Sequence, residues 1–221
     1  MFHPLEHPME RGWVGRIDGD HVVHLAAQTL ESFFTGGGTA REHAVYPLEA
    51  VRLLPPVLHP PAVRVFEDDA SFVFANPAAI VGPDAAITAD AASLALVPRI
   101  AAVIGVGGAI GGCTGFVEWR RPELPAPKDR DFALGLGPFV VTSDELGDEV
   151  RVTVRVDGDE QGSASGEARC ERIRDVAAAG TVLRPGDLVV ARPLAVVEDV
   201  AAGAEVEVEF AGIGTLRQVV R

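Results

Sequence analysis

Charged side chains crowd into residues 118–131, EWRRPELPAPKDRD, the segment with the most chemical potential in the sequence. It contains four carboxylates and four cations: Glu118, Glu123, Asp129, Asp131, Arg120, Arg121, Lys128 and Arg130. Such a segment is usually a solvated loop, and its composition alone favours that interpretation. The same groups could instead line a pocket, with carboxylates holding Mg²⁺ and the basic side chains holding an anionic substrate.

Lys128 and Asn76 are each the single representative of their residue type. Lys128 is the only lysine among 19 basic residues, and Asn76 is the only asparagine. A GC-rich genome depletes both residue types, so either residue could survive by chance. Arginine cannot replace a lysine that must lose its proton or act as a compact charge, which makes Lys128 a candidate catalytic residue.

Other familiar catalytic and nucleotide-binding patterns are missing from the sequence. It has no P-loop, HExxH or GxSxG motif, and the glycine-rich residues 105–112 lack GxGxxG spacing. The six histidines all lie within the first 59 residues, which favours structural or surface roles for them. Nucleotide binding and histidine-based metal or triad chemistry are therefore not expected.

Composition narrows the possible partners. The 221 residues carry a net charge of −13, which repels phosphate backbones and argues against nucleic acid as a partner. No apolar stretch is long enough to span a bilayer, and no basic amphipathic helix suggests a membrane surface. The first residues lack the apolar core of a secretion signal, and Cys113 and Cys170 lack a disulfide or CxxC pattern. We expect a cytoplasmic protein with two buried thiols.

Hydrophobic patterning indicates an α+β protein that is mainly β. Residues 11–24 are typical of a hairpin, 25–34 of a helix ended by three glycines, and 51–66 of a proline-rich linker. Six later segments are typical of strands: 72–82, 94–105, 139–142, 150–156, 187–194 and 205–210. One later helix is expected over 166–179. Because strands and helices do not alternate, we predict mixed sheets rather than a doubly wound fold.

A series of short blocks, in order, resembles the fumarylacetoacetate hydrolase superfamily over nearly the whole chain. The most specific are FVFANPAAIVGP (72–83), CTGFVEWRR (113–121) and KDRDFALGLGPFVVTSDEL (128–146). The weaker blocks are VGRIDGDHVVHLAA, VRLLPPV, AAVIG, LRPGDLVV and the closing GIGTLRQVV. Each block is weak alone, and their common order and spacing carry the resemblance.

The resemblance implies a mixed β-roll or pseudo-barrel, usually as a homodimer, with a small N-terminal ββα domain. On this basis we expect a small domain over 1–50, the linker over 51–66 and a catalytic-type domain over 67–221. It also implies Mg²⁺ or a similar ion acting as an electron sink in C–C bond hydrolysis, or decarboxylation, of small 1,3-dicarbonyl or 2-oxo acids.

Transferred residue by residue, the family's site is altered in this chain. The two metal-binding glutamates of its E-x-E motif fall on Val97 and Arg99, and its metal-binding aspartate falls on Glu118. The active-site lysine falls on Lys128, Asn76 lies beside a position that lines the cleft, and Asp131 is a weak further metal ligand.

The remaining transferred positions are also substituted. Arg192 occupies the place of a late threonine, and Arg121 adjoins the place of the motif's arginine. The lid histidine is missing, with Glu67 or Asp69 as the nearest substitute. We therefore expect Glu118, Asp131 and Lys128 near one cleft, with Arg99 close to the place of the metal.

Two functions remain open at this point. The chain is either a hydrolase of this family acting on a small oxo acid, with Mg²⁺ or with no metal, or a non-catalytic homologue. The homologue would bind a small anionic ligand in a pocket formed by Arg99, Lys128 and Arg192, or serve as a structural subunit of an active paralogue.

Overall fold

A long hairpin forms the centre of the computed structural model, which describes residues 1–88, 91, 93–168 and 170–221. Strand β10 (Ser93–Ile104) is buried over almost its whole length and pairs antiparallel with β11 (Ile110–Arg120). Their nearly continuous apolar sequences suit strands that are covered on both faces. This hairpin supplies two of the residues singled out above, Arg99 and Glu118.

Strands far apart in the sequence join this hairpin in an eight-stranded mixed sheet. The order is β7 (Phe72–Ala75), β6 (Val63–Phe66), β15 (Leu188–Val190), β10, β11, β12 (Leu134–Val141) and β8 (Ile80–Val81). Strand β16 (Val197–Ala201) also pairs with β10. Two of the pairings are parallel, β6 with β15 and β8 with β12, so the sheet is mixed as predicted.

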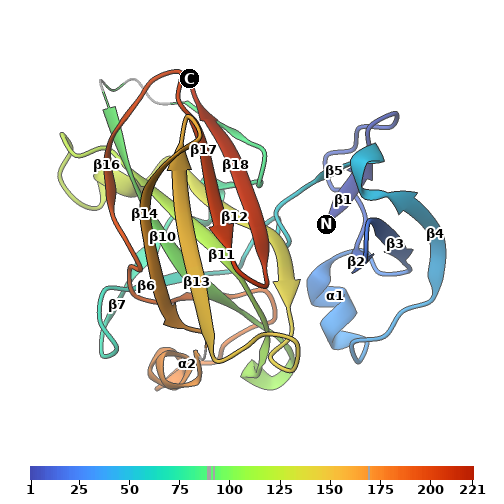
Figure 1. Cartoon of the computed structure of the whole chain (residues 1–221). Helices are drawn as coiled ribbons and strands as arrows, with labels where there is room; N and C mark the ends of the chain where they lie inside the picture. The colour runs from blue at the N-terminus through green and yellow to red at the C-terminus, as the bar shows by residue number, and fades with distance from the viewer. Residues whose placement is uncertain (89–90, 92, 169) are drawn as a thin grey trace.

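A five-stranded sheet packs against the first one (Figure 1). Its order is β14 (Asp159–Glu167), β13 (Glu149–Val156), β17 (Glu205–Phe210), β18 (Gly214–Val220) and β9 (Ala86–Ile87). In β17 the valines face the core and the glutamates alternate outward. A buried hydrogen bond of 2.7 Å from Trp119 Nε1 to Gln218 Oε1 joins β11 to β18. The structure confirms the predicted class, a mainly β fold with a curled, half-barrel sheet.

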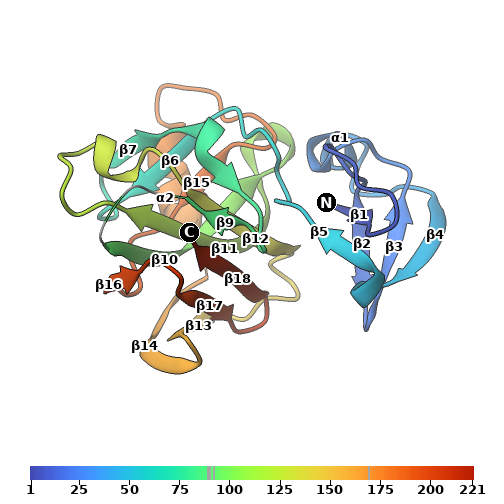
Figure 2. The same ribbon diagram turned by 90° about the horizontal axis from the view of Figure 1, so that it is seen from above.

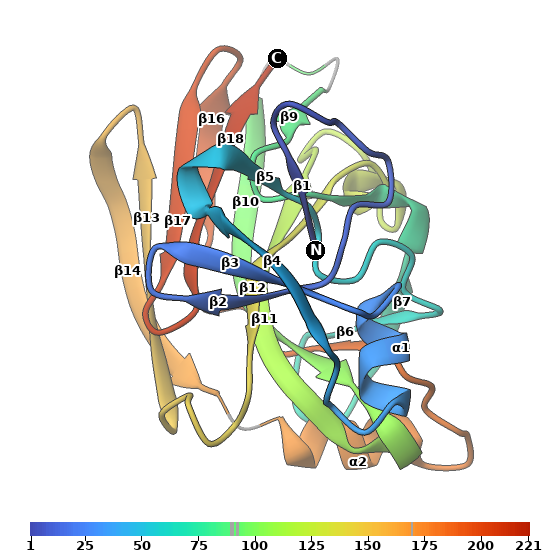
Figure 3. The same ribbon diagram turned by 90° about the vertical axis from the view of Figure 1, so that its right-hand side faces the viewer.

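The N-terminal elements lie to one side of these two sheets (Figures 2 and 3). Strands β2 (Gly15–Asp18), β3 (His21–Leu25) and β4 (Glu42–Pro47) form a three-stranded sheet, and β1 (Phe2–Pro4) pairs with β5 (Val51–Leu53). Helix α1 (Leu30–Thr35) starts five residues later than predicted, because Leu25 ends β3 and Thr29 caps the helix through Ser32.

The second predicted helix also begins later than the sequence suggested. Helix α2 covers Glu171–Ala178, whereas Gly166 and Glu167 continue β14 through their pairing with β13. The expectation for residue 169 lies outside the described residues. The strand expected over 72–82 is interrupted by a 3₁₀ turn, Pro77–Ala79, which Asn76 caps. The strands predicted over 150–156 and 205–210 are confirmed, and both cysteines are buried free thiols.

Candidate functional site

Arg99 and Glu118 meet on one face of the central hairpin. The register pairs Val97 with Glu118 and Arg99 with Phe116, so Arg99 is the diagonal neighbour of Glu118 on the same sheet face. Both side chains are almost completely buried, and Arg99 Nη2 lies 3.3 Å from Glu118 Oε2. The sequence therefore brings together the arginine and the carboxylate that the resemblance places at the metal position.

Two further arginines complete the surroundings of Glu118. Arg120, two residues along β11 on the same face, pairs with Glu118 Oε1 through its Nε. Arg130 approaches from the turn after β11, with Nη1 at 3.3 Å from the same oxygen. The buried carboxylate thus faces three guanidinium groups, which satisfies the rule that buried charges are paired.

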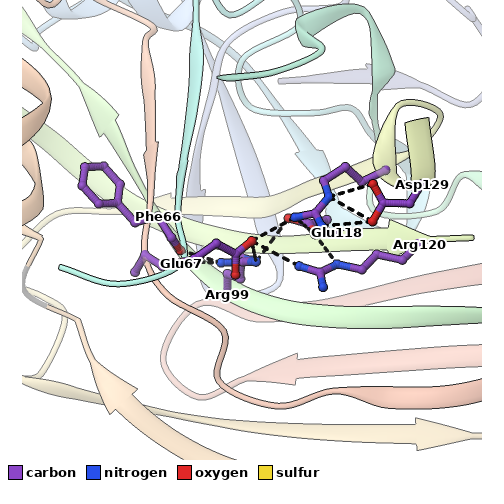
Figure 4. Close-up of polar contacts among 8 residues, drawn as sticks. Phe66, Glu67, Arg99, Glu118, Arg120 and Asp129 are labelled. Carbon is purple, nitrogen blue, oxygen red and sulfur yellow. Dashed lines mark hydrogen bonds and ion pairs between the residues drawn. The ribbon is translucent and has the colours of Figure 1, made fainter. Parts of the chain in front are cut away.

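The same three arginines converge on one oxygen of Glu67 (Figure 4). Glu67 follows the last residue of β6, and its Oε1 lies 3.1 Å from Arg99, 3.3 Å from Arg120 and 2.9 Å from Arg130. Burial raises the pKa of the Glu67 carboxyl, but the guanidiniums, Arg99 above all, outweigh it and hold the pKa below its usual value. Glu67 is therefore ionised within this network.

Arg99 is held rigidly at the bottom of the network. Its Nη1 donates to the carbonyl oxygens of Phe66, at 2.7 Å, and Ala191, at 3.2 Å, whereas its buried Nε has no hydrogen-bond partner. Burial lowers the pKa of Arg99, and the carboxylates of Glu118 and Glu67 oppose this effect. A guanidinium remains charged under such conditions because its intrinsic pKa lies far above neutral pH.

Asp129 closes the outer side of the network. It accepts hydrogen bonds from Nε and Nη2 of Arg130 at 3.0–3.2 Å, a nearly bidentate pairing. Burial lowers the pKa of Arg130, but Asp129, Glu118 and Glu67 more than compensate, so its pKa is raised. Three arginines and three carboxylates therefore form one network with no net charge.

Lys128, Asp131 and Asn76 form a separate group, in which Lys128 begins the 3₁₀ turn Lys128–Arg130 and Asp131 directly follows it. Lys128 Nζ lies 2.9 Å from Asp131 Oδ2, and Asn76 Nδ2 donates to Asp131 Oδ1 at 2.8 Å. The hydrogen bond from Lys128, followed by that from Asn76, lowers the pKa of Asp131. The Lys128 side chain is 70% exposed. The structure thus places Lys128 and Asp131 together, and Glu118 with Arg99 in the neighbouring network.

The other two arginines proposed to bind substrate are Arg121 and Arg192. The backbone N–H of Arg121 donates to the carbonyl oxygen of Asp129 at 2.7 Å. Arg121 Nε pairs with Glu123 at 2.9 Å, and Arg192 is exposed after β15. The network instead uses Glu67, Arg120, Arg130 and Asp129, which the sequence did not assign as a unit. For Arg120, Asp129 and Arg130, the signal in the sequence was the high density of charged residues over 118–131.

The donor set does not fit the divalent metal that the resemblance implies. Among residues 1–88, 91, 93–168 and 170–221, no group of three or more His, Cys, Asp or Glu side chains is arranged to hold a metal ion. Of the three transferred ligand positions, Val97 offers no donor and Arg99 offers a cation. Mg²⁺ requires about six oxygen ligands, whereas both oxygens of Glu118 and Oε1 of Glu67 lie within ion-pair distance of guanidiniums.

A cavity of about 580 Å³ lies elsewhere, between the N-terminal elements and the larger sheets. It is lined mainly by apolar side chains, among them Phe2, Phe33, Phe34, Phe139 and Ile213. Arg99, Glu118 and Glu67 do not line it, so its size carries no argument about the ionic site.

Comparison with known proteins places this fold. Residues 116–221 match the family model described as fumarylacetoacetate (FAA) hydrolase C-terminal. Maleylpyruvate hydrolase from Sphingobium sp. SYK-6, crystallised with manganese(II) ion and pyruvate, is 19% identical over 96% of each chain, with a TM-score of 0.77. None of the curated protein sequences compared with this chain matches it.

Two further solved structures are similar over most of their length. The 2-hydroxyhepta-2,4-diene-1,7-dioate isomerase from Mycobacterium marinum is 23% identical over 94% of this chain and 92% of its own, with a TM-score of 0.77. The fumarylacetoacetate hydrolase from Exiguobacterium antarcticum is 20% identical over 96% and 95%, with a TM-score of 0.76. These identities show a shared fold.

Residues 116–221 match the C-terminal part of the fumarylacetoacetate hydrolase family, and the half-barrel fold of the chain is the one that solved structures of this type share. Both findings agree with the resemblance of the sequence blocks to that superfamily. Neither helix in the part of the chain that the structure describes combines the length and apolarity needed to cross a membrane.

Proposed function

We propose that this chain binds a small carboxylic acid without catalysing the metal-dependent reaction of its family. One observation carries the proposal, the buried Arg99 guanidinium 3.3 Å from Glu118 in the network described above. Because the Arg99 guanidinium already occupies the position beside Glu118, no set of free carboxylates remains there to bind a divalent metal ion. This is the non-catalytic alternative raised from the sequence.

Electrostatics supports the exclusion of a metal ion. A divalent cation bound by Glu118 would lie within a few ångströms of Arg99, Arg120 and Arg130, all at most 24% exposed. Like charges at such separations repel by several kcal/mol at an effective dielectric constant near 20. The ion would also have to displace three existing ion pairs from the Glu118 carboxylate.

The choice of ligand follows from the same arginines. Guanidinium groups recognise carboxylates through paired hydrogen bonds, and three of them converge here within about 3 Å of one carboxylate oxygen. Several similar proteins act on small organic acids by their names, and one of them was crystallised with pyruvate. A small carboxylic acid is thus the ligand class that suits both the network and the superfamily.

The test combines metal binding with a substrate panel. We expect isothermal titration calorimetry with Mn²⁺ and Mg²⁺ to show no tight binding, and oxaloacetate and acylpyruvates to remain unconsumed with or without metal. A Val97→Glu/Arg99→Glu variant restores two carboxylates, and Mn²⁺ should raise its melting temperature but not that of the natural chain. Tight Mn²⁺ binding to the natural chain, or metal-dependent turnover, would overturn the proposal.

The homodimer implied by the resemblance also remains a proposal. Light scattering on the purified chain, which gives the mass in solution directly, would test it.

A further inference from the structure

We propose that Glu67 is an internal occupant of a carboxylate site formed by Arg99, Arg120 and Arg130, and that an organic acid displaces it. The inference rests on the proposed function and specifies where and how the acid binds. In Figure 4 the Glu67 carboxylate points at Arg99 and Arg120, with its Oε1 shared among the guanidiniums. A ligand carboxylate would take over the contacts of that oxygen.

Of the two glutamates in the network, Glu67 is the one that is free to leave. Glu118 lies within β11 and its side chain is 1% exposed, whereas Glu67 lies beyond the end of β6 and its side chain is 44% exposed. Withdrawal of Glu67 moves a carboxylate from the network into water, whereas the Glu118 side chain is buried within the sheet and has no such access to water. Displacement of Glu67 therefore opens the site at the smaller energetic cost.

The backbone around Glu67 allows a side-chain movement without unfolding the loop. Asp68 accepts hydrogen bonds from the backbone N–H groups of Ala70 and Ser71, both at 2.8 Å, which fixes the turn directly after Glu67. Asp69 pairs with Arg172 of α2 at 3.2 Å. Rotation about the Glu67 side-chain bonds is sufficient to exchange its carboxylate for another.

The charge of the network favours binding of an anion when the Glu67 carboxylate has left it. With Glu67 in place the six groups sum to zero; without it, Arg99, Arg120 and Arg130 face only Glu118 and Asp129, which leaves one uncompensated positive charge. The three arginines are at most 24% exposed, so solvent screens this charge weakly. Arg99 is also held in place by the Phe66 and Ala191 carbonyls, so the site needs little reorganisation.

The first test is chemical rescue. Glu67→Ala removes the internal carboxylate and leaves space into which acetate, the truncated equivalent of the lost group, fits. We expect acetate and pyruvate to raise the melting temperature of this variant saturably, by several degrees more than that of the natural chain. Acetamide at the same concentration and sodium chloride at the same ionic strength should have no such effect.

A matched control separates the site from general anion effects. Glu209 is 49% exposed and pairs with Arg155 at 3.1 Å on the far sheet, so Glu209→Ala deletes a comparable glutamate outside the network. Acetate should not raise its melting temperature more than that of the natural chain. Equal rescue of both variants would overturn the assignment to the three-arginine site.

The second test measures affinity and does not depend on Glu67→Ala being stable. Glu67→Gln preserves the side-chain shape and removes the charge, and we expect it to bind pyruvate at least tenfold more tightly than the natural chain by calorimetry. If pyruvate binds equally to the natural chain and to Glu67→Gln, the acid binds at another site. That result overturns the role of Glu67 and leaves the proposed function intact. Absence of pyruvate binding to either chain overturns both. Tight Mn²⁺ binding to the natural chain, with pyruvate still bound more tightly by Glu67→Gln, overturns the metal-free part of the proposed function and supports the displacement of Glu67.

Discussion

Arg99 is an unusual residue to bury at the centre of a sheet. Its side chain is fully inaccessible, yet its charge is balanced by Glu118 and Glu67, and two of its donor contacts go to backbone carbonyls. An ion pair of this kind rarely stabilises a fold more than well-packed apolar residues do, but removal of one partner is costly. Loss of Arg99 would leave a buried carboxylate and two backbone carbonyls without this donor, and this cost keeps the arginine in place.

Replacement of Arg99 by methionine should therefore destabilise the chain strongly. Arg99→Met leaves the buried Glu118 carboxylate with two arginines instead of three, and leaves the Phe66 and Ala191 carbonyls without their donor. We expect a loss of about 3 kcal/mol in the free energy of unfolding, measured by urea titration. Arg99→Lys, which keeps the charge but loses the planar fork, should lose less. A loss for Arg99→Met below about 1 kcal/mol would contradict this assessment of the network.

Glu67 should make stability depend on pH in the acidic range. Its pKa in the folded chain lies below the value of about 4.3 typical of an unfolded glutamate, because the arginines outweigh the effect of burial. Its contribution is complete above the unfolded pKa and disappears as the pH falls through the lower folded value. The stability difference between the natural chain and Glu67→Gln should therefore shrink from pH 6 to about pH 3. Urea titrations at each pH measure it, and a constant difference would show that Glu67 is not stabilised as an anion.

At the scale of the elements, the two sheets pack closely at Gly115 of β11, which has no side chain. A Cβ atom added to Gly115 would lie 2.6 Å from two ring carbons of Phe210 in β17 and 2.7 Å from the carbonyl oxygen of Gly137 in β12. The backbone oxygen cannot yield as a flexible side chain can. Glycine at this position therefore permits close packing of the two sheets on the face of β11 opposite to the one that bears Glu118.

Gly115→Ala should consequently destabilise the chain by about 1–3 kcal/mol, the usual cost of overpacking a tight core. Gly162 is the matched control, since it lies in β14 with no atom within 4 Å of an added Cβ. Gly162→Ala should be neutral or slightly stabilising, because alanine restricts the unfolded chain. Thermal and urea unfolding of both variants gives the comparison, and similar behaviour of the pair would rule out a close contact at Gly115.

The elements show which features of this fold can be predicted from the sequence. The alternation of apolar and polar residues over 150–156 and 205–210 was sufficient to predict both strands, since each strand has one buried face. Helix ends were less predictable from the sequence. The cap at Thr29 and the pairing of Glu167 with β13 decide where each helix begins, and the spacing of apolar residues contains no signal for either.

The candidate site was partly predictable in the same sense. The resemblance located Arg99 and Glu118, which the sheet register then placed side by side. Glu67 and Arg130 are separated by 63 residues and meet only through the fold, so no spacing in the sequence could connect them. Lys128 was a candidate because it is the only lysine in the sequence. Its contacts place it with Asp131 and Asn76, in a different group from the buried network.

At the scale of the whole molecule, helix α1 joins the N-terminal elements to the larger sheets. Leu30 and Phe34 pack against the core cluster that includes β6, β12 and β15, whereas Phe33 packs within the N-terminal elements themselves. The ring of Phe34 also lies against Gly111 at the start of β11, where an added Cβ would be 2.6 Å away. One turn of helix thus presents two neighbouring aromatic rings to two different cores.

Phe34→Ala should loosen the attachment between the two parts of the molecule. The lost ring contacts of a partly buried phenylalanine correspond to about 1–2 kcal/mol, and hydrogen exchange should accelerate in the connecting residues 54–62 as well as in α1. Phe33→Ala removes the adjacent ring of equal size, and its effect should fall mainly on β3 and α1, because Phe33 packs against the cluster of Val14, Val23 and Leu25. Hydrogen exchange followed by mass spectrometry distinguishes the two patterns. If Phe34→Ala left exchange in 54–62 unchanged, the N-terminal elements would have to be held by other contacts, such as those of Leu30 with the same core.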